Sequence, residues 1–293
     1  MYAVVGATGN TGRVVAEELL AGGHAVRVIG RSEEKLAGFV EKGAEAAVGD
    51  VSDAEFVTAA CAGVGGVYCM IPPLYEVDLR AWQTEAGTAL VSGIREAGVP
   101  YVVNLSSVGA QHHEGTGPIA GLREQEDRLN ELSVANVLHL RPGWFMENFF
   151  MSLEVIRGMG VLGMPIRGDL PIAMIATRDI GAEAARRLAA LDFDGHHTSE
   201  LLGPREYTLT EVASIIGEAI GKPDLPFVRV PDEVAAAGLA EMGAHPTTVA
   251  TVMEMYRGLD EGRIVPEETR YKGNTTLTTF EEFAQGLAAA YAA

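Results

Sequence analysis

Cysteine, lysine and long apolar runs are all scarce in this sequence. Its 293 residues include only two cysteines, Cys61 and Cys69, too few for a disulfide framework, and neither lies in a spacing typical of a metal site. No run of about 18 apolar residues escapes interruption by glycine, proline or charge, so a membrane-spanning helix is not expected. The N-terminus also lacks the basic segment and apolar run of a signal peptide. We therefore expect a cytoplasmic protein that binds neither a membrane nor a metal ion.

Basic residues are outnumbered by acidic ones. Lysine and arginine total 22 against 40 aspartates and glutamates, which gives a formal charge of −18. This charge repels phosphate backbones and no local basic stripe offsets it, so direct nucleic-acid binding is not expected. Hydrophobic residues make up 47% of the chain, enough for a substantial core, and the length suits one large domain with a smaller lobe.

The first half of the chain alternates short apolar, β-rich runs with longer amphipathic stretches. This alternation is typical of successive βαβ units and predicts an α/β fold with a Rossmann-type, doubly wound parallel sheet. Strands are expected at 3–5, 25–29, 46–48, 67–71, 101–105 and 136–140, and helices at 11–20, 33–41, from Ser52 or Asp53 onward, 77–97, 122–132 and 146–157.

Glycine and proline become frequent after residue 157, and the expected elements become shorter. This change predicts a Rossmann domain over 1–157 and a smaller C-terminal α/β lobe, for a substrate or a partner, over 158–293. The boundary is gradual, because the chain is expected to return to the main sheet near 172–190. In this half, helices are expected at 178–191 and 210–220 and a strand at 198–202.

A glycine-rich turn, Gly6-Ala7-Thr8-Gly9-Asn10-Thr11-Gly12, joins the first expected strand to the first helix. Gly6 allows a tight turn, Gly9 allows the backbone to approach a pyrophosphate, and Gly12 allows close helix–strand packing. The free amides and the dipole at the helix start favour an anion. The turn therefore predicts that the first domain binds NAD(P). The alternative is a glycine-rich turn without a ligand.

The end of the second expected strand favours NADP(H) over NAD. An NAD site would place a carboxylate there, whereas this strand ends Ile29-Gly30-Arg31-Ser32. Arg31 and Ser32 can bind a 2′-phosphate, with Lys35 one helical turn further on. Arg31 could instead be a solvated charge. Asp50 and Val51 follow the third strand, where adenine would lie, although Asp50 could equally cap a helix.

These segments, together with Asn104-Leu105-Ser106-Ser107 and the run from Leu140 to Asn148, resemble the NmrA-like branch of the atypical short-chain dehydrogenases/reductases. The resemblance extends from residue 1 to about residue 200. It implies an NAD(P)-binding Rossmann domain and a smaller substrate lobe. It also implies one of two functions: NADPH-dependent reduction of quinones or dyes, or redox sensing without catalysis.

The Tyr-x-x-x-Lys pair of typical short-chain dehydrogenases is absent. None of the eight tyrosines has a lysine four residues on, and the family's helix pattern places the two positions at Pro118 and Leu122. Without the pair, ordinary carbonyl–alcohol interconversion is not expected, whereas an acceptor that takes a proton from water, such as a quinone, remains feasible. We predict an NADPH-dependent oxidoreductase that transfers hydride to a small flat or conjugated acceptor. The alternative is a non-catalytic NADP(H)-sensing regulator that acts through protein partners.

Several polar groups are expected near the nicotinamide, at the carboxyl edge of the sheet. Ser106 and Ser107 end the fifth strand and can orient nicotinamide or substrate, or simply cap a turn. His113 lies in the loop that follows and can donate a proton near neutral pH, although loop histidines without a role are commoner. The catalytic candidates are therefore His113 and Ser107.

Aromatic residues after the fourth and sixth strands suit a flat, apolar acceptor. Expected substrate contacts are Tyr75, Trp144, Phe145 and Asn148. The expected cofactor-binding residues are Gly6, Thr8, Gly9, Asn10, Thr11, Gly12, Arg31, Ser32, Lys35, Asp50, Val51, Met70, Ile71, Pro72, Ser106 and Pro142.

Overall fold

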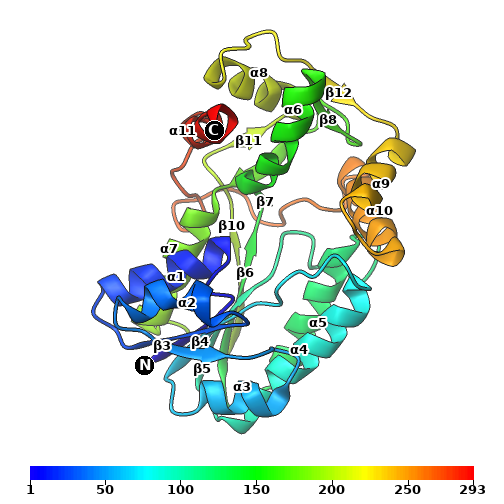
Figure 1. The fold of residues 1–293 in the computed structure, drawn as a ribbon. Helices are drawn as coiled ribbons and strands as arrows, with labels where there is room; N and C mark the ends of the chain where they lie inside the picture. Colours follow the sequence, from blue (N-terminus) through cyan, green and yellow to red (C-terminus); the bar gives the residue numbers. More distant parts are fainter.

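A seven-stranded parallel sheet forms the centre of the computed structural model, which describes residues 1–293 (Figure 1). Its strands are β1 (Tyr2–Val5), β2 (Val26–Gly30), β3 (Glu45–Val48), β4 (Gly66–Cys69), β5 (Tyr101–Leu105), β6 (Asn136–Pro142) and β10 (His196–Leu201). Their order is β10-β6-β5-β4-β1-β2-β3, and all neighbouring pairs are parallel. The order reverses between β1 and β4, where doubly wound sheets bind ligands. The predicted Rossmann-type fold is confirmed.

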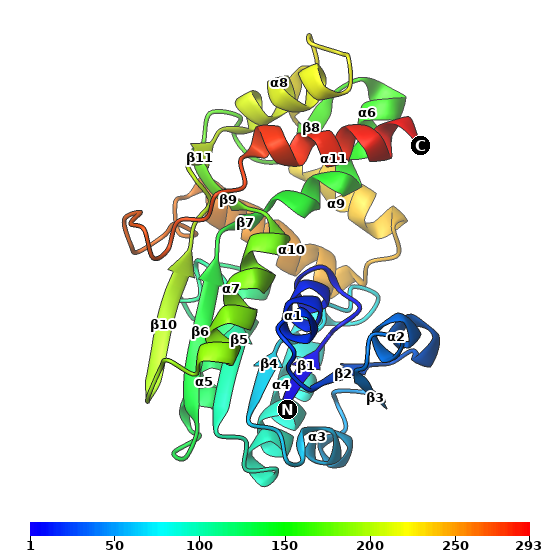
Figure 2. The ribbon, with the colours of Figure 1, turned by 90° about the vertical axis from the view of Figure 1, so that its left-hand side faces the viewer.

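Helices cover both faces of this sheet (Figure 2). On one face α1 (Asn10–Ala21), α2 (Glu33–Val40) and α7 (Thr177–Ala190) bury their apolar sides in one hydrophobic cluster. On the other face α3 (Ala54–Cys61), α4 (Leu79–Glu96) and α5 (Pro118–Asn130) form a second cluster. In β1, Val4 faces the first cluster while Ala3 and Val5 face the second. A parallel strand buried on both sides therefore consists of consecutive apolar residues.

Short polar side chains begin several of these helices at the carboxyl edge of the sheet. The Ser32 hydroxyl accepts a hydrogen bond from the Lys35 amide at the start of α2. Asp53 caps α3 and Asp78 caps α4, each by accepting two backbone amides. These caps satisfy amides that the first helical turn leaves free, and they hold the strand–helix loops in place.

The C-terminal part packs above the carboxyl edge of the sheet around a third cluster (Figure 2). Two small sheets, β11-β9-β7 and β12-β8, contribute to it. Its elements are β7 (Trp144–Phe145), the 3-10 helix η1 (Met146–Ser152), α6 (Leu153–Met159), β8 (Leu162–Met164), β9 (Ile172–Ile175), β11 (Glu206–Tyr207), α8 (Leu209–Ala219), β12 (Phe227–Arg229), α9 (Asp232–Glu241), α10 (Pro246–Asp260) and α11 (Phe280–Ala292).

The chain returns to the main sheet near 172–190 as a helix and not as a strand. Helix α7 packs on β4 and β5 of the main sheet and against α1. The strand in this segment, β9, pairs with β7 and β11 in a small sheet, and the strand that joins the main sheet beside β6 is β10. An apolar triplet predicts a strand but does not specify which sheet it joins, because that choice depends on distant partners. The division at residues 157 and 158 stays a prediction.

Two classes of feature are absent from the structure. None of its helices combines the length and the apolar character that a bilayer crossing requires. Its histidine, cysteine, aspartate and glutamate side chains nowhere gather in a group of three or more that could hold a metal ion.

Candidate functional site

The glycine-rich turn lies between β1 and α1 with little room for side chains. Gly6 has a φ of +67°, which favours glycine, and a Cβ added there would lie 2.7 Å from the Met70 sulfur. A Cβ on Gly12 would lie 2.3 Å from the Gly6 carbonyl oxygen. Helix α1 begins after Gly9 without a side-chain cap, so its first amides have no side-chain acceptor. The turn therefore offers bare backbone donors to an anion.

A recess opens beside this turn, at the carboxyl ends of four neighbouring strands. It brings together side chains from the loops after β1, β2, β3 and β4, which are far apart in the sequence. Six of the sixteen predicted cofactor residues line it: Gly6, Thr8, Arg31, Asp50, Val51 and Pro72. The other lining residues are Ile29, Gly30, Gly49, Pro73, Leu74 and Trp82.

Cationic side chains without an ion-pair partner lie next to the recess. Every arginine except Arg13 and Arg31 has a carboxylate within ion-pair distance. Arg31 lines the recess and Arg13 belongs to the first turn of α1, and both side chains are exposed. Lys35 is also exposed and unpaired, while Ser32 is engaged as the cap of α2. In a chain of net charge −18, unpaired cations at this edge favour an anionic ligand.

Several predicted cofactor residues form hydrogen bonds within the protein. The Thr11 hydroxyl is buried and accepts a hydrogen bond of 2.8 Å from Tyr68. The Ser106 hydroxyl is buried and donates to Glu126 at 2.5 Å. The Pro142 carbonyl accepts the Val108 amide at 3.0 Å. The Thr11 and Ser106 hydroxyls are therefore occupied within the protein, and their contact with a cofactor stays a prediction.

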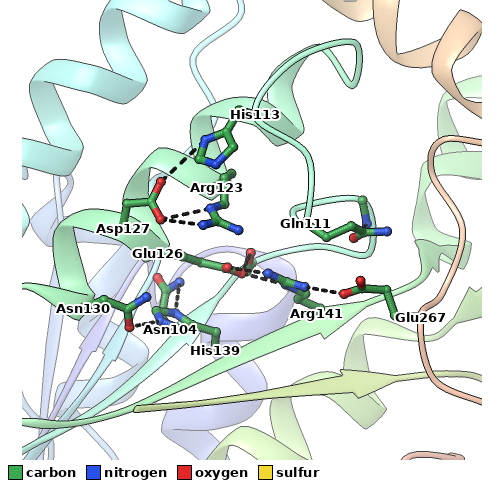
Figure 3. Close-up of polar contacts among 12 residues, drawn as sticks. Asn104, Gln111, His113, Arg123, Glu126, Asp127, Asn130, His139, Arg141 and Glu267 are labelled. Carbon is green, nitrogen blue, oxygen red and sulfur yellow. Dashed lines mark hydrogen bonds and ion pairs between the residues drawn. The ribbon is translucent and has the colours of Figure 1, made fainter.

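The partner of Ser106 belongs to a buried ionic cluster beneath the β5 and β6 ends (Figure 3). Glu126 on α5 pairs with Arg141 on β6 at 2.7 Å, and both side chains are less than 10% exposed. Arg141 also reaches Glu267, at 3.1 Å. The backbone amides of Glu267 and Glu268 in turn donate to the Glu200 carboxylate on β10. The cluster therefore ties the segment after α10 to the main sheet.

The two predicted catalytic residues lie in different surroundings. The Ser107 hydroxyl is half-buried and donates to the Val108 carbonyl at 2.9 Å. The His113 side chain is 66% exposed, and its Nδ1 lies 3.7 Å from the Asp127 carboxylate on α5 (Figure 3). Asp127 is the orienting partner that the sequence did not identify. An exposed imidazole, however, has no enclosed space for a substrate beside it. Both catalytic roles stay predictions.

The predicted substrate residues face two different clusters. Phe145 packs against the Rossmann cluster that contains β1, as does Met70. Trp144 packs against the C-terminal cluster, and its ring centroid lies 6.3 Å from that of Tyr256 on α10. Tyr75 is 48% exposed in the loop after β4, and Asn148 is half-buried in η1. The indole N–H of Trp144 is buried without an acceptor.

Sequence reasoning missed Trp82 and Tyr256. The Trp82 indole donates to the Pro72 carbonyl at 2.7 Å and so fixes the loop that walls the recess. Trp82 lies one turn into α4. Because the first turns of such helices lie at the carboxyl edge of the sheet, this position alone indicates a residue close to the ligand-binding edge. Tyr256 lies more than a hundred residues beyond Trp144, in a segment without a motif, so no sequence pattern indicated it.

Comparison with known proteins relates this arrangement to characterised reductases. The chain is 28% identical over its whole length to the whole of the NAD(P)H azoreductase of Xenophilus azovorans. Its fold matches the NADPH-dependent quinone oxidoreductase of Escherichia coli complexed with NADPH, with a TM-score of 0.83, 24% identity and 98% and 99% of the two chains covered. It also matches the triphenylmethane reductase of Citrobacter sp. complexed with NADP(H), with a TM-score of 0.79, 21% identity and 98% of this chain and 100% of the other covered. The model of the NmrA-like family matches residues 2–284, and the chain belongs to that family.

Proposed function

We propose that this protein is an NADPH-dependent oxidoreductase that reduces a small, flat or conjugated acceptor such as a quinone. The observation that carries the proposal is the recess at the ends of β1 to β4, with the unpaired Arg31 at its wall. The named activities of the relatives, which act with NAD(P)H on azo compounds, quinones and triphenylmethane dyes, support the same reaction class.

The residues of the recess fit NADPH chemically. The bare turn from Gly6 to Gly12 offers uncapped amides to the pyrophosphate, and no Cβ fits at either end of it. Arg31 offers a planar guanidinium to a 2′-phosphate, with Lys35 near the start of the next helix. Asp50 is held by the amide and hydroxyl of Ser52, which orients its other oxygen for the adenine edge.

When bound, NADPH supplies the hydride, so the protein has to position the acceptor and exclude water. Trp144 and Tyr75 offer aromatic surface at the carboxyl edge to a flat acceptor. Neither Pro118 nor Leu122 can act as the acid and cation of a typical short-chain dehydrogenase. The proposed acceptors are therefore electrophiles whose reduction does not depend on that pair.

The test measures NADPH and NADH oxidation by the purified protein with quinones, azo dyes, enones and triphenylmethane dyes. Arg31→Glu replaces the proposed 2′-phosphate contact with a like charge. We expect NADPH affinity to fall about 10- to 100-fold, the effect of losing a charge-assisted hydrogen bond, and NADH affinity to change far less. Lys272→Glu is the matched control, because it alters the net charge equally at an exposed site near the bridge between Leu202 and Thr275.

Three outcomes are informative. Saturable turnover with NADPH preferred supports the proposal. Equal losses for NADPH and NADH in Arg31→Glu contradict the 2′-phosphate contact. Tight NADPH binding with no turnover of any acceptor favours the alternative from the sequence, a regulator that senses NADP(H) and acts through protein partners.

A further inference from the structure

Helix α10 packs against α4 and α5 and is bonded to the loops that precede these two helices (Figure 1). At its N-terminal end, the His245 amide donates to the Tyr75 carbonyl at 2.8 Å, and the Thr248 hydroxyl donates to the Val77 carbonyl at 2.6 Å. The Thr248 hydroxyl also accepts the Leu79 amide at 3.0 Å. Because residues 75–79 follow β4, these bonds anchor the helix beside the recess.

The next turns of α10 pack on the loop between β5 and α5. The Glu254 carboxylate accepts the Gly115 amide at 2.9 Å. Gly117 has a φ of +59°, and a Cβ added there would lie 2.1 Å from the Thr251 carbonyl oxygen and 2.9 Å from the Met255 amide. This close approach brings α10 directly against the start of α5. Pro118, where the family pattern would place the catalytic tyrosine, is the first residue of that helix.

Tyr256 directly follows Met255 in α10, whose amide lies against Gly117. Its ring lies 6.3 Å from the Trp144 ring, at 31°. Its side chain is half-buried, and its hydroxyl has no hydrogen-bond partner in the protein, so it is free to meet a ligand. The indole N–H of the neighbouring Trp144 is buried without an acceptor. A buried donor without an acceptor, beside a ring whose hydroxyl is free, points to a ligand with acceptor atoms.

The surroundings keep the Tyr256 phenol protonated. Burial, together with the neighbouring Tyr75 phenol, raises the pKa of Tyr256 to about 12. At neutral pH the group is therefore a neutral donor, able to give its proton to a strongly basic atom. The nitrogen anion left when hydride adds to an azo bond is such an atom. The phenolate left when hydride adds to a quinone is less basic than this phenol and takes its proton from water.

We propose that Tyr256 is the proton donor of this reductase and takes the place of the tyrosine that α5 lacks. The proposal rests on the proposed function. Hydride from NADPH adds to one nitrogen of an azo acceptor and leaves an anion on the other. The Tyr256 O–H bond breaks as the proton passes to that anion, and the tyrosinate regains a proton from water. The products are NADP⁺ and the two-electron-reduced, protonated acceptor.

The test uses Tyr256→Phe, which keeps the ring against Trp144 and removes only the hydroxyl. Tyr271→Phe makes the same chemical change at an exposed phenol outside the proposed site and is the matched control. Each variant is assayed with an azo compound, whose reduction needs a proton on nitrogen. Each is also assayed with a cationic triphenylmethane dye, which becomes neutral when hydride adds to its central carbon and needs no proton. We expect Tyr256→Phe to lower kcat for the azo compound about 100-fold, to leave dye reduction within about twofold, and to keep the thermal midpoint.

Two further readouts do not depend on the dye. At fixed pH and ionic strength, imidazolium should raise the rate of azo reduction by Tyr256→Phe in proportion to its concentration, and leave that of the unmodified protein unchanged. Without NADPH, quenching of tryptophan fluorescence by the azo compound should report a dissociation constant about 2- to 10-fold higher in Tyr256→Phe, the effect of one lost hydrogen bond.

The outcomes separate this inference from the proposed function. If the unmodified protein turns over no acceptor, the proposed function fails. If it reduces only acceptors that need no such proton, or if Tyr256→Phe reduces azo compounds equally well, only the role of Tyr256 fails. Equal losses with azo compound and dye, or an equal azo defect in Tyr271→Phe, would likewise overturn the role as proton donor.

Discussion

Lowering the pH should destabilise the folded protein through His139, a buried histidine on β6 (Figure 3). The Asn104 amide donates to its Nδ1 at 3.2 Å, and its Nε2–H donates to the Asn130 oxygen at 3.0 Å. Both ring nitrogens of the neutral imidazole are therefore used. Burial lowers the pKa of His139 to about 4, an effect that Glu126 opposes and Arg141 reinforces. If the imidazole binds a second proton, the new Nδ1–H faces the Asn104 amide N–H and has no acceptor.

The size of the effect follows from the two pKa values. The imidazole binds a proton near pH 6.5 in the unfolded chain and near pH 4 in the folded protein. Between these values the unfolded state holds more protons, so stability is full above about pH 6.5 and falls as the pH is lowered. The slope is about 1.4 kcal/mol per pH unit, which amounts to about 3 kcal/mol over the whole interval. Between pH 7.5 and 5.5 the loss is about 1 kcal/mol.

Urea unfolding at several pH values from 7.5 to 5.5 measures this loss, in a range above the isoelectric point of about 4.8. The matched variant is His139→Gln, which keeps one donor and one acceptor but does not titrate. Every contribution that the two proteins share cancels in the difference between their curves. We expect the free energy of unfolding to fall by about 1 kcal/mol more in the unmodified protein. Parallel curves, or NMR signals showing that the folded imidazole titrates near pH 6.5, would refute the reasoning.

Two further predictions concern packing. Gly12→Ala should lower NADPH affinity more than tenfold and cost about 1 to 2 kcal/mol of stability, because its Cβ would lie 2.3 Å from the Gly6 carbonyl oxygen. The control is Gly38→Ala in α2, where a Cβ meets nothing within 4 Å; it should slightly raise stability and leave NADPH affinity unchanged. Calorimetry measures the stability of the two variants, and cofactor titration measures their NADPH affinity. Burial raises the pKa of Cys61 to about 11 and that of Cys69 to about 12. A thiol reagent at pH 8 should therefore label both cysteines only after the protein unfolds. Rapid labelling of the folded protein would contradict this prediction.

Local patterns predicted the Rossmann part of the fold well because its determinants are local. Apolar runs such as Val102-Val103 indicate buried strands, and Asp53 marks a helix start by its own side chain. Arg31 was predicted to contact a 2′-phosphate because its position, directly after β2, depends only on the strand that precedes it. In the structure Arg31 lines the recess. Ser106 illustrates the limit of this reasoning. Its place at the end of β5 was predicted, but its hydroxyl is bound to Glu126, twenty residues away on α5.

The sequence by itself determined the βαβ order, the glycine turn and the absence of the Tyr-x-x-x-Lys pair, since each depends on residues within a few positions of one another. Only the tertiary structure decided that β9 joins a small sheet while β10 completes the large one. It alone also decided that α10 packs on Gly117 and brings Tyr256 beside Trp144. The physical reason is that strand pairing and helix packing depend on the fit between surfaces from distant segments, and no periodicity within one segment encodes its partner.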